Sequence, residues 1–141
     1  MAAYATLADL VSRYGQDDLV AVNVSRDAPL GQIDQARVQQ ALEDASSLID
    51  SYLRRRYVTP VAQTVPALTA ACCKLARFSL AVGSTVVPTD QMRADRKDAM
   101  AWLADIGSGK ATLDIAVTVD KTDTWSRVAS RRPGLSASRC F

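Results

Sequence analysis

The chain has 141 residues, which suits a single domain that can bury a sizeable core. Its 48% hydrophobic and 23% charged residues are ordinary for a folded protein and exclude disorder along the whole length. The net charge of +2 is too small for nucleic-acid binding through overall charge, and no window predicts a membrane-spanning helix. Because the N-terminus has no signal-peptide pattern, the expectation is synthesis and residence in a cytoplasm.

The first predicted helix is short and begins after Thr6, a good N-cap residue. Asp9 stands three residues later, where the acid of a capping box belongs, and Gly15 is a suitable stop. A second brief turn is expected over residues 17–22. Residues 25–31 contain Asp, Pro and Gly and are predicted to form a loop.

The strongest helical pattern covers about six turns between Ile33 and Tyr57. Thr59 and Pro60 prevent the helix from continuing. Its apolar positions recur at helical spacing: Val38, Ala41, Leu42, Ala45, Leu48, Ile49, Tyr52 and Leu53.

A third helix is predicted from Pro66, which suits a first turn, to a stop at Gly83. It is apolar on nearly all sides, and Lys74 and Arg77 are its only charges. Such a helix belongs in the centre of a bundle or against a neighbouring subunit.

The fourth predicted helix starts at Thr89 or Asp90 and ends at the cluster of residues 107–109. Its charges favour a solvated face, since acids and bases alternate at spacings that allow pairing. Trp102 lies off the best apolar line, so a core position and an interface position both stay open. The charged run comprises Asp90, Arg93, Asp95, Arg96, Lys97 and Asp98.

After Gly109 the pattern changes, so we divide the chain into a helical domain (residues 1–109) and a C-terminal arm (residues 110–141). Alternation over about 113–119 predicts a short strand. The remainder has few aliphatic residues and no acid after Asp123, so it cannot bury enough area to fold alone. The candidate contacts of the arm with a partner are Trp125, Arg127, Arg131, Arg132, Leu135, Arg139 and Phe141. The predicted fold class is mainly α: a bundle of about four helices with a short strand or hairpin and an extended arm.

The sequence indicates no catalytic, cofactor or metal site. The chain has no histidine, which removes the commonest general base and a common metal ligand. Cys72 and Cys73 are predicted to be reduced core residues, because three unspaced cysteines describe neither a disulfide framework nor a zinc site. Gly107 to Lys110 resembles the end of a phosphate-binding loop, but a helix C-cap explains these residues better. We therefore expect a protein that is not an enzyme.

Arg54, Arg55 and Arg56 form the most informative basic cluster. Consecutive residues point to different sides of a helix end, so the three cannot all serve its dipole. They are either solvated or paired within the chain, or they contact an acidic neighbour or the phosphates of passing DNA.

These features, taken in chain order, resemble the Mu-like phage and prophage family of small neck proteins, which belong among the head–tail connector or adaptor proteins. The resemblance spans most of residues 4–110. It is carried by Tyr4-Ala5-Thr6, Asp9-Leu10, Arg13-Tyr14-Gly15, Ala45 to Ile49, Asp50-Ser51-Tyr52-Leu53, Arg56-Tyr57, Pro60, Cys72 to Phe78, Arg96 to Ala99, Trp102-Leu103 and Gly107 to Lys110.

The resemblance implies a helical bundle in a virion neck, made in the host cytoplasm and assembled as a ring, with twelve copies expected. Its implied partners are further copies of the chain, the portal protein, the next neck or tail protein, and genomic DNA that passes through the channel without sequence-specific binding; no membrane is implied. The family's basic, aromatic tail ending in phenylalanine matches Arg131 to Phe141. Here Pro133, Gly134 and Cys140 depart from that pattern, which leaves the docking of the arm open.

Two rival functions differ in class from a structural adaptor. A DNA-binding accessory module would use Arg54–Arg56 and the basic arm, and its binding would weaken steeply with salt. A small nuclease would need acids clustered around a metal, whereas the acids here are spread over polar faces. Within the leading class, the roles of adaptor, stopper and tail-completion protein are similar in size and duty.

Overall fold

The computed structural model describes residues 3–24 and 29–115, which form five helices. Their bounds are α1 Leu7–Tyr14, α2 Gln16–Val22, α3 Gln35–Leu53, α4 Pro66–Val82 and α5 Asp90–Ser108. The predicted mainly helical bundle is confirmed, and the expected brief turn after Gly15 is a helix of its own. No strand forms within these two ranges.

Local capping explains where the helices begin and end. The Thr6 side chain accepts from the Asp9 backbone N–H, and the Asp9 carboxylate accepts from the Thr6 N–H, as the capping-box pattern predicts. Asp34 caps α3 and Thr89 caps α5. Gly15 (φ +83°) turns the chain sharply between α1 and α2, and Gly109 (φ +90°) ends α5. The Gly107–Lys110 turn is thus a helix C-cap.

The long helix is shorter than its apolar pattern, because α3 ends at Leu53 and residues 54–57 form turns. Tyr57 nevertheless remains in the core, at 4% exposure. The backbone N–H groups of Arg56 and Tyr57 both donate to the Leu53 carbonyl, which folds this segment back over the helix end. The apolar pattern therefore extends to Tyr57, four residues beyond the end of α3 at Leu53.

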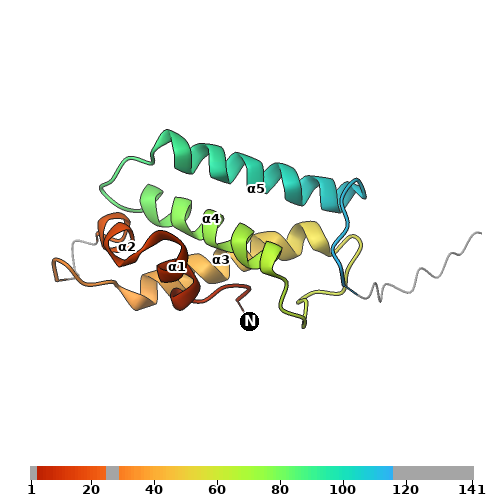
Figure 1. The fold of residues 1–141 in the computed structure, drawn as a ribbon, viewed down its shortest axis with the longest axis horizontal. Helices are drawn as coiled ribbons and strands as arrows, with labels where there is room; N and C mark the ends of the chain where they lie inside the picture. Colours follow the sequence, from red (N-terminus) through yellow and green to blue (C-terminus); the bar gives the residue numbers. More distant parts are fainter. Residues whose placement is uncertain (1–2, 25–28, 116–141) are drawn as a thin grey trace, which may run out of the picture.

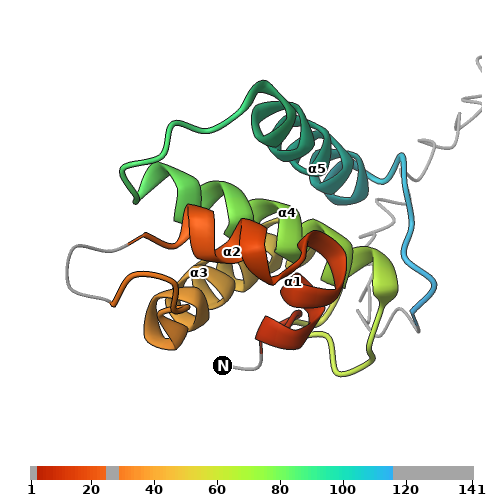
Figure 2. The same cartoon turned by 60° about the vertical axis from the view of Figure 1, so that its left-hand side comes forward.

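The helix α4 occupies the centre of the bundle and packs against the other four helices. Figure 1 shows α5 on one side of α4 and α3 on the other, while α1 and α2 cover a third side, as Figure 2 also shows. This position explains why α4 is apolar on nearly all sides. Its eight buried residues are Leu68, Ala71, Cys72, Cys73, Leu75, Ala76, Leu80 and Ala81.

The chain around Tyr4 holds the N-terminal segment against α3 and α4. The Tyr4 backbone N–H donates to Ser46 Oγ (3.0 Å), and the Tyr4 carbonyl accepts from Thr69 Oγ1 (2.9 Å). The phenol donates to Asp50 and accepts from the Val61 N–H at 3.0 Å. Burial, followed by the hydrogen bond to Asp50, raises the pKa of Tyr4 to about 12.

A bidentate ion pair joins α2 to α4. Arg77 Nη2 lies 2.7 Å from Asp18 Oδ1, and Nε lies 2.9 Å from Oδ2. The guanidinium also lies over the Tyr14 ring, 4.5 Å from its centroid. The hydrogen bond to Asp18 raises the pKa of Arg77, so the guanidinium stays charged and holds α2 against α4.

Candidate functional site

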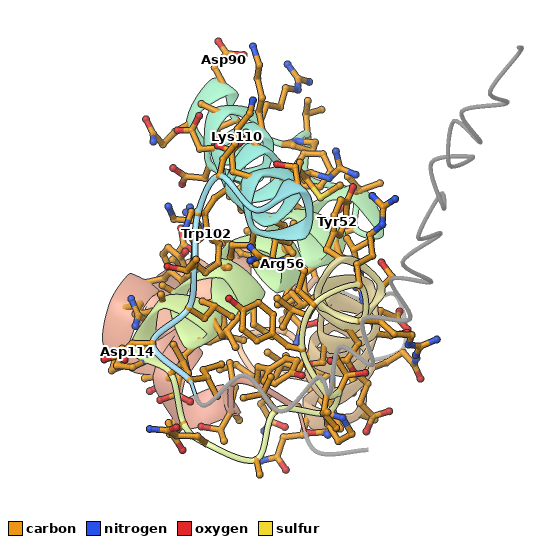
Figure 3. The ribbon with its side chains drawn as sticks, turned by 90° about the vertical axis from the view of Figure 1, so that its right-hand side faces the viewer. Tyr52, Arg56, Asp90, Trp102, Lys110 and Asp114 are labelled. Carbon is orange, nitrogen blue, oxygen red and sulfur yellow. The ribbon has the colours of Figure 1, made fainter. Side chains whose placement is uncertain are left out.

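The arginine cluster separates into two exposed side chains and one that packs inside. Arg54 and Arg55 are exposed just beyond α3, whereas Arg56 is half-buried. A Cβ atom added at Gly109 would lie 3.1 Å from Arg56 Nη1, so the guanidinium rests on the C-terminal turn of α5. Figure 3 looks onto this end of the bundle and labels Arg56 below α5. A cation there complements the negative end of the α5 dipole, which leaves Arg54 and Arg55 as the residues able to meet a partner.

The first residues of the C-terminal arm are fixed to the bundle; we call residues 110–115 the arm root. The Leu113 backbone N–H donates to the buried Tyr57 hydroxyl at 2.9 Å, and the Leu113 side chain is only 7% exposed. The Ile115 N–H donates to the Leu113 carbonyl at 2.8 Å, which makes a tight turn instead of the predicted strand at 113–115. The rest of that predicted strand lies outside the described residues.

Beside the arm root lies a hollow of about 280 Å³, which we call the root hollow. Tyr57, Val58, Pro60, Val61 and Ile115 contribute to its lining. The arm therefore leaves the described structure at an apolar surface. The proposed contacts of the arm lie outside the described residues: Trp125, Arg127, Arg131, Arg132, Leu135, Arg139 and Phe141.

A second concave surface, the α3–α4–α5 groove, has a volume of about 250 Å³. Its shape follows from the helix arrangement. A Cβ at Gly107 would lie 3.3 Å from the Tyr52 carbonyl, so α3 and α5 approach closely at their C-terminal ends. Figure 1 shows the two helices spreading apart towards their N-terminal ends, where α4 lies between them. The surface contributed by the three helices includes Asp44, Leu48, Leu75, Phe78, Val82 and Arg96.

The groove has an apolar floor and charged rims. Leu48 and Phe78 are half-buried, and Val82 is 58% exposed. Asp44 on α3 accepts a hydrogen bond from Gln40 (3.0 Å), and the Arg96 guanidinium lies 5.0 Å from the centroid of the Phe78 ring. The sequence patterns did not predict this groove. The available signal was that the apolar pattern of α4 includes Val82, which five helices leave uncovered.

The remaining candidates have structural explanations. Cys72 and Cys73 are free and fully buried, and burial raises the pKa of both thiols, that of Cys73 to about 11. Both are thus protonated at neutral pH and are weak nucleophiles. Trp102 is half-buried at the margin of the core. On α5, Arg93 pairs with Asp90 at 3.3 Å in an exposed position, as expected of a solvated face.

The described residues contain neither a metal-binding cluster nor a membrane-spanning helix. Within residues 3–24 and 29–115, no group of three or more acids and cysteines is arranged to hold a metal ion. In the same part of the chain, no helix has the length and hydropathy needed to span a bilayer.

The fold is a small helical bundle with a groove between three of its helices and an anchored arm root. Comparison with known proteins specifies the family. The sequence profile of the family described as "Bacteriophage Mu, Gp36" matches residues 4–131. The chain belongs to this family of phage proteins, which points to a structural or morphogenetic protein.

Two relatives support that membership. The chain is 40% identical over 117 residues to "Mu-like prophage FluMu protein gp36" of Haemophilus influenzae, an alignment that covers 82% of this chain and 79% of the relative. It is 38% identical over 107 residues to "Gene product J" of Escherichia phage Mu, covering 76% of this chain and 73% of the relative.

Proposed function

We propose that this chain is a structural head–tail adaptor of a phage neck, which forms a ring under the portal, extends the DNA channel and joins the capsid to the tail. The observation that carries the proposal is membership of the bacteriophage Mu Gp36 family. A non-enzymatic role agrees with the described residues, whose cysteines are buried and whose acids are all half-buried or exposed, with none fully buried.

The division into bundle and arm supports an adaptor. An adaptor must hold a stable shape and also reach a neighbouring protein. Here the bundle has its own core, and the Tyr57–Leu113 hydrogen bond fixes the point from which the arm extends. In the proposed ring of twelve copies, arms that lie on the portal add buried area without a larger domain.

Arg54 and Arg55 are the proposed contacts with DNA in the channel, since both are exposed at one end of the bundle. Two cations per copy, repeated around a ring, would line a channel with positive charge without reading sequence. Arg56 contributes less to such a surface because its guanidinium rests on α5.

The test is to delete this gene from an inducible phage genome. We expect DNA-filled heads and separate tails, because the link between them is missing. Supplying the full chain from a plasmid restores joined particles. Joined particles without the protein, or a block before heads form, would show that the proposed role is wrong.

The alternative, a DNA-binding accessory module, rests on the same exposed Arg54 and Arg55. It predicts that the isolated protein binds duplex DNA with an affinity that falls steeply between low and physiological salt. The adaptor proposal expects weak binding of the isolated chain, since two phosphate contacts per copy give little affinity outside a ring.

A further inference from the structure

We propose that residues 123–127 of the arm dock across the α3–α4–α5 groove of their own chain, with Trp125 in the groove, Asp123 at Arg96 and Arg127 at Asp44. This intramolecular site is independent of the neck assignment. It concerns where the arm lies on the isolated protein.

The first argument is that the groove needs an apolar occupant. Phe78 and Val82 form a floor that the five helices leave accessible, and Val82 is 58% exposed. The volume of about 250 Å³ is suited to a large aromatic side chain. An indole ring placed there would pack beside Phe78 and the Arg96 guanidinium that lies over its ring, and it would exclude water from Leu48 and Val82.

The second argument is charge complementarity. The groove has an acid on its α3 rim, Asp44, and a base on its α5 rim, Arg96, and neither forms an ion pair within the part of the chain that the structure describes. The sequence Asp123-Thr124-Trp125-Ser126-Arg127 has an acid two residues before the tryptophan and a base two residues after it. The groove and this segment therefore carry matching sets: an apolar centre between opposite charges.

The third argument is spacing. In an extended segment residues i−2, i and i+2 face the same side, so Asp123, Trp125 and Arg127 would all point towards the groove. Asp123 and Arg127 would stand about 13 Å apart. That separation suits the two rim helices, since each packs on α4 with an expected interaxial distance of about 8–10 Å.

The large apolar residues further along the arm fit less well. Leu135 and Phe141 follow Asp123, the last acid in the sequence, so neither has an acid and a base on its two sides. Of these three side chains, Trp125 alone has the charge pattern of the groove.

The arm of the same chain is long enough. Asp123 is eight positions after Ile115, and an extended chain of eight steps spans at most about 26–29 Å. Leu48 lies five residues before Leu53, the end of α3, which is about 8 Å along the helix axis. Residues 54–57 turn back at that end to Tyr57, which contacts the arm root. The segment can therefore reach the groove without a second copy.

The experiment uses the full chain with Trp102→Phe, so that Trp125 is the only fluorescent indole, and measures quenching by acrylamide. We expect quenching to be about threefold weaker than in a free peptide of residues 119–131, since a docked indole is shielded. Val82→Asp in the groove should raise quenching to the level of the peptide. Val58→Asp is the matched control, since Val58 is also 58% exposed but lies in the root hollow, and it should change nothing.

Charge reversal tests the orientation. Asp44→Arg should increase the quenching of Trp125, and Asp44→Arg combined with Arg127→Asp should restore protection. Hydrogen exchange of the unmodified chain gives a second measurement that does not depend on Trp102→Phe: amides of residues 121–128 should exchange more slowly than in the peptide, and Val82→Asp should abolish the difference.

Three outcomes would overturn the proposal. Quenching equal to that of the peptide would mean that the segment is free. Release of Trp125 by Val58→Asp instead of Val82→Asp would place it in the root hollow. Protection that grows with protein concentration would assign the groove to the arm of a second copy.

Discussion

At the scale of residues, most of the arginines with defined contacts serve the fold. Arg37 donates to the carbonyls of Val24 (3.2 Å) and Leu80 (3.1 Å), near the ends of α2 and α4. Arg56 rests on the end of α5, and Arg77 is paired with Asp18. Cations at the C-terminal ends of neighbouring helices offset the helix dipoles. Net charge therefore overstates the positive surface that this protein can offer to DNA.

We predict that Arg77→Ala lowers the free energy of unfolding by about 1–3 kcal/mol, since it leaves the partly buried Asp18 without its bidentate donor. Urea denaturation monitored by circular dichroism measures the change. The matched control is Arg93→Ala, which removes an exposed pair with Asp90 and should leave the midpoint unchanged. Equal losses in the two variants would show that the burial of the Arg77 pair contributes nothing.

Alkaline pH should destabilise the protein through buried acids that stay protonated in the fold. Burial raises the pKa of Cys73 from its ordinary 9.0 to about 11. The folded protein then retains a proton that the unfolded chain loses. The burial of the neutral Cys73 thiol therefore contributes its full stabilisation below pH 9, and this stabilisation is lost as the pH rises through 11. Tyr4, with its pKa raised to about 12, acts in the same direction at higher pH.

The measurement is the urea midpoint at pH 7, 9, 10 and 11 for the unmodified chain and for Cys73→Ala. We expect the variant to lose less stability between pH 9 and 11, because it has no thiol at this position to ionise. An identical decline in both proteins would show that Cys73 contributes nothing to the pH dependence.

At the scale of elements, Tyr57 controls the arm root. Tyr57→Phe removes the acceptor of the Leu113 N–H and should lower stability by about 1–2 kcal/mol, because a buried donor loses its partner. Hydrogen exchange should show faster exchange at residues 110–115 than elsewhere. Tyr52→Phe is a suitable control, since Tyr52 is half-buried on the same helix end. Uniform acceleration over the whole bundle would mean that the arm root is not a separate unit.

The sequence predicted the helices well because their end signals are local. Thr6, Gly15, Pro66, Thr89 and Gly109 each act on backbone groups a few residues away, so their effect can be read without the tertiary structure. The strand predicted over about 113–119 is not confirmed at its described residues, 113–115, because alternation cannot distinguish an extended segment from a turn that buries Leu113. A strand also needs a partner strand, which the described residues do not supply there.

The groove could not be predicted, because it depends on distances between elements. The apolar stripes of α3, α4 and α5 predict that these helices have buried faces. The close approach at Gly107 and the opening near Val82 depend instead on how the three helices cross. Tertiary structure also decides the direction of Arg56. The sequence predicts a basic cluster at Arg54–Arg56, but Arg56 points inward because α5 ends beside it at Gly109.

At the scale of the whole molecule, the bundle should fold without most of the arm. Within the described residues the core lies between Ala5 and Leu113, so removing residues 121–141 takes none of these side chains away. We predict that the truncated chain keeps its helical circular dichroism and melts within a few degrees of the full chain, yet does not bind the portal protein of its own phage. Co-purification of the two proteins measures the binding. Truncated protein that binds the portal as well as the full chain would contradict the assigned role of the arm.

The hydrogen bond between Tyr57 and Leu113 also has a mechanical meaning. Tension applied to the arm would first load the contact of Leu113 with Tyr57 at this end of the core, before α5 could unravel from its C-terminal turn. The buried Leu113 side chain and its hydrogen bond to Tyr57 would both have to break before the tension reaches α5. In the proposed role as an adaptor, the chain would thus transmit a pull through this buried contact instead of through a fraying helix end.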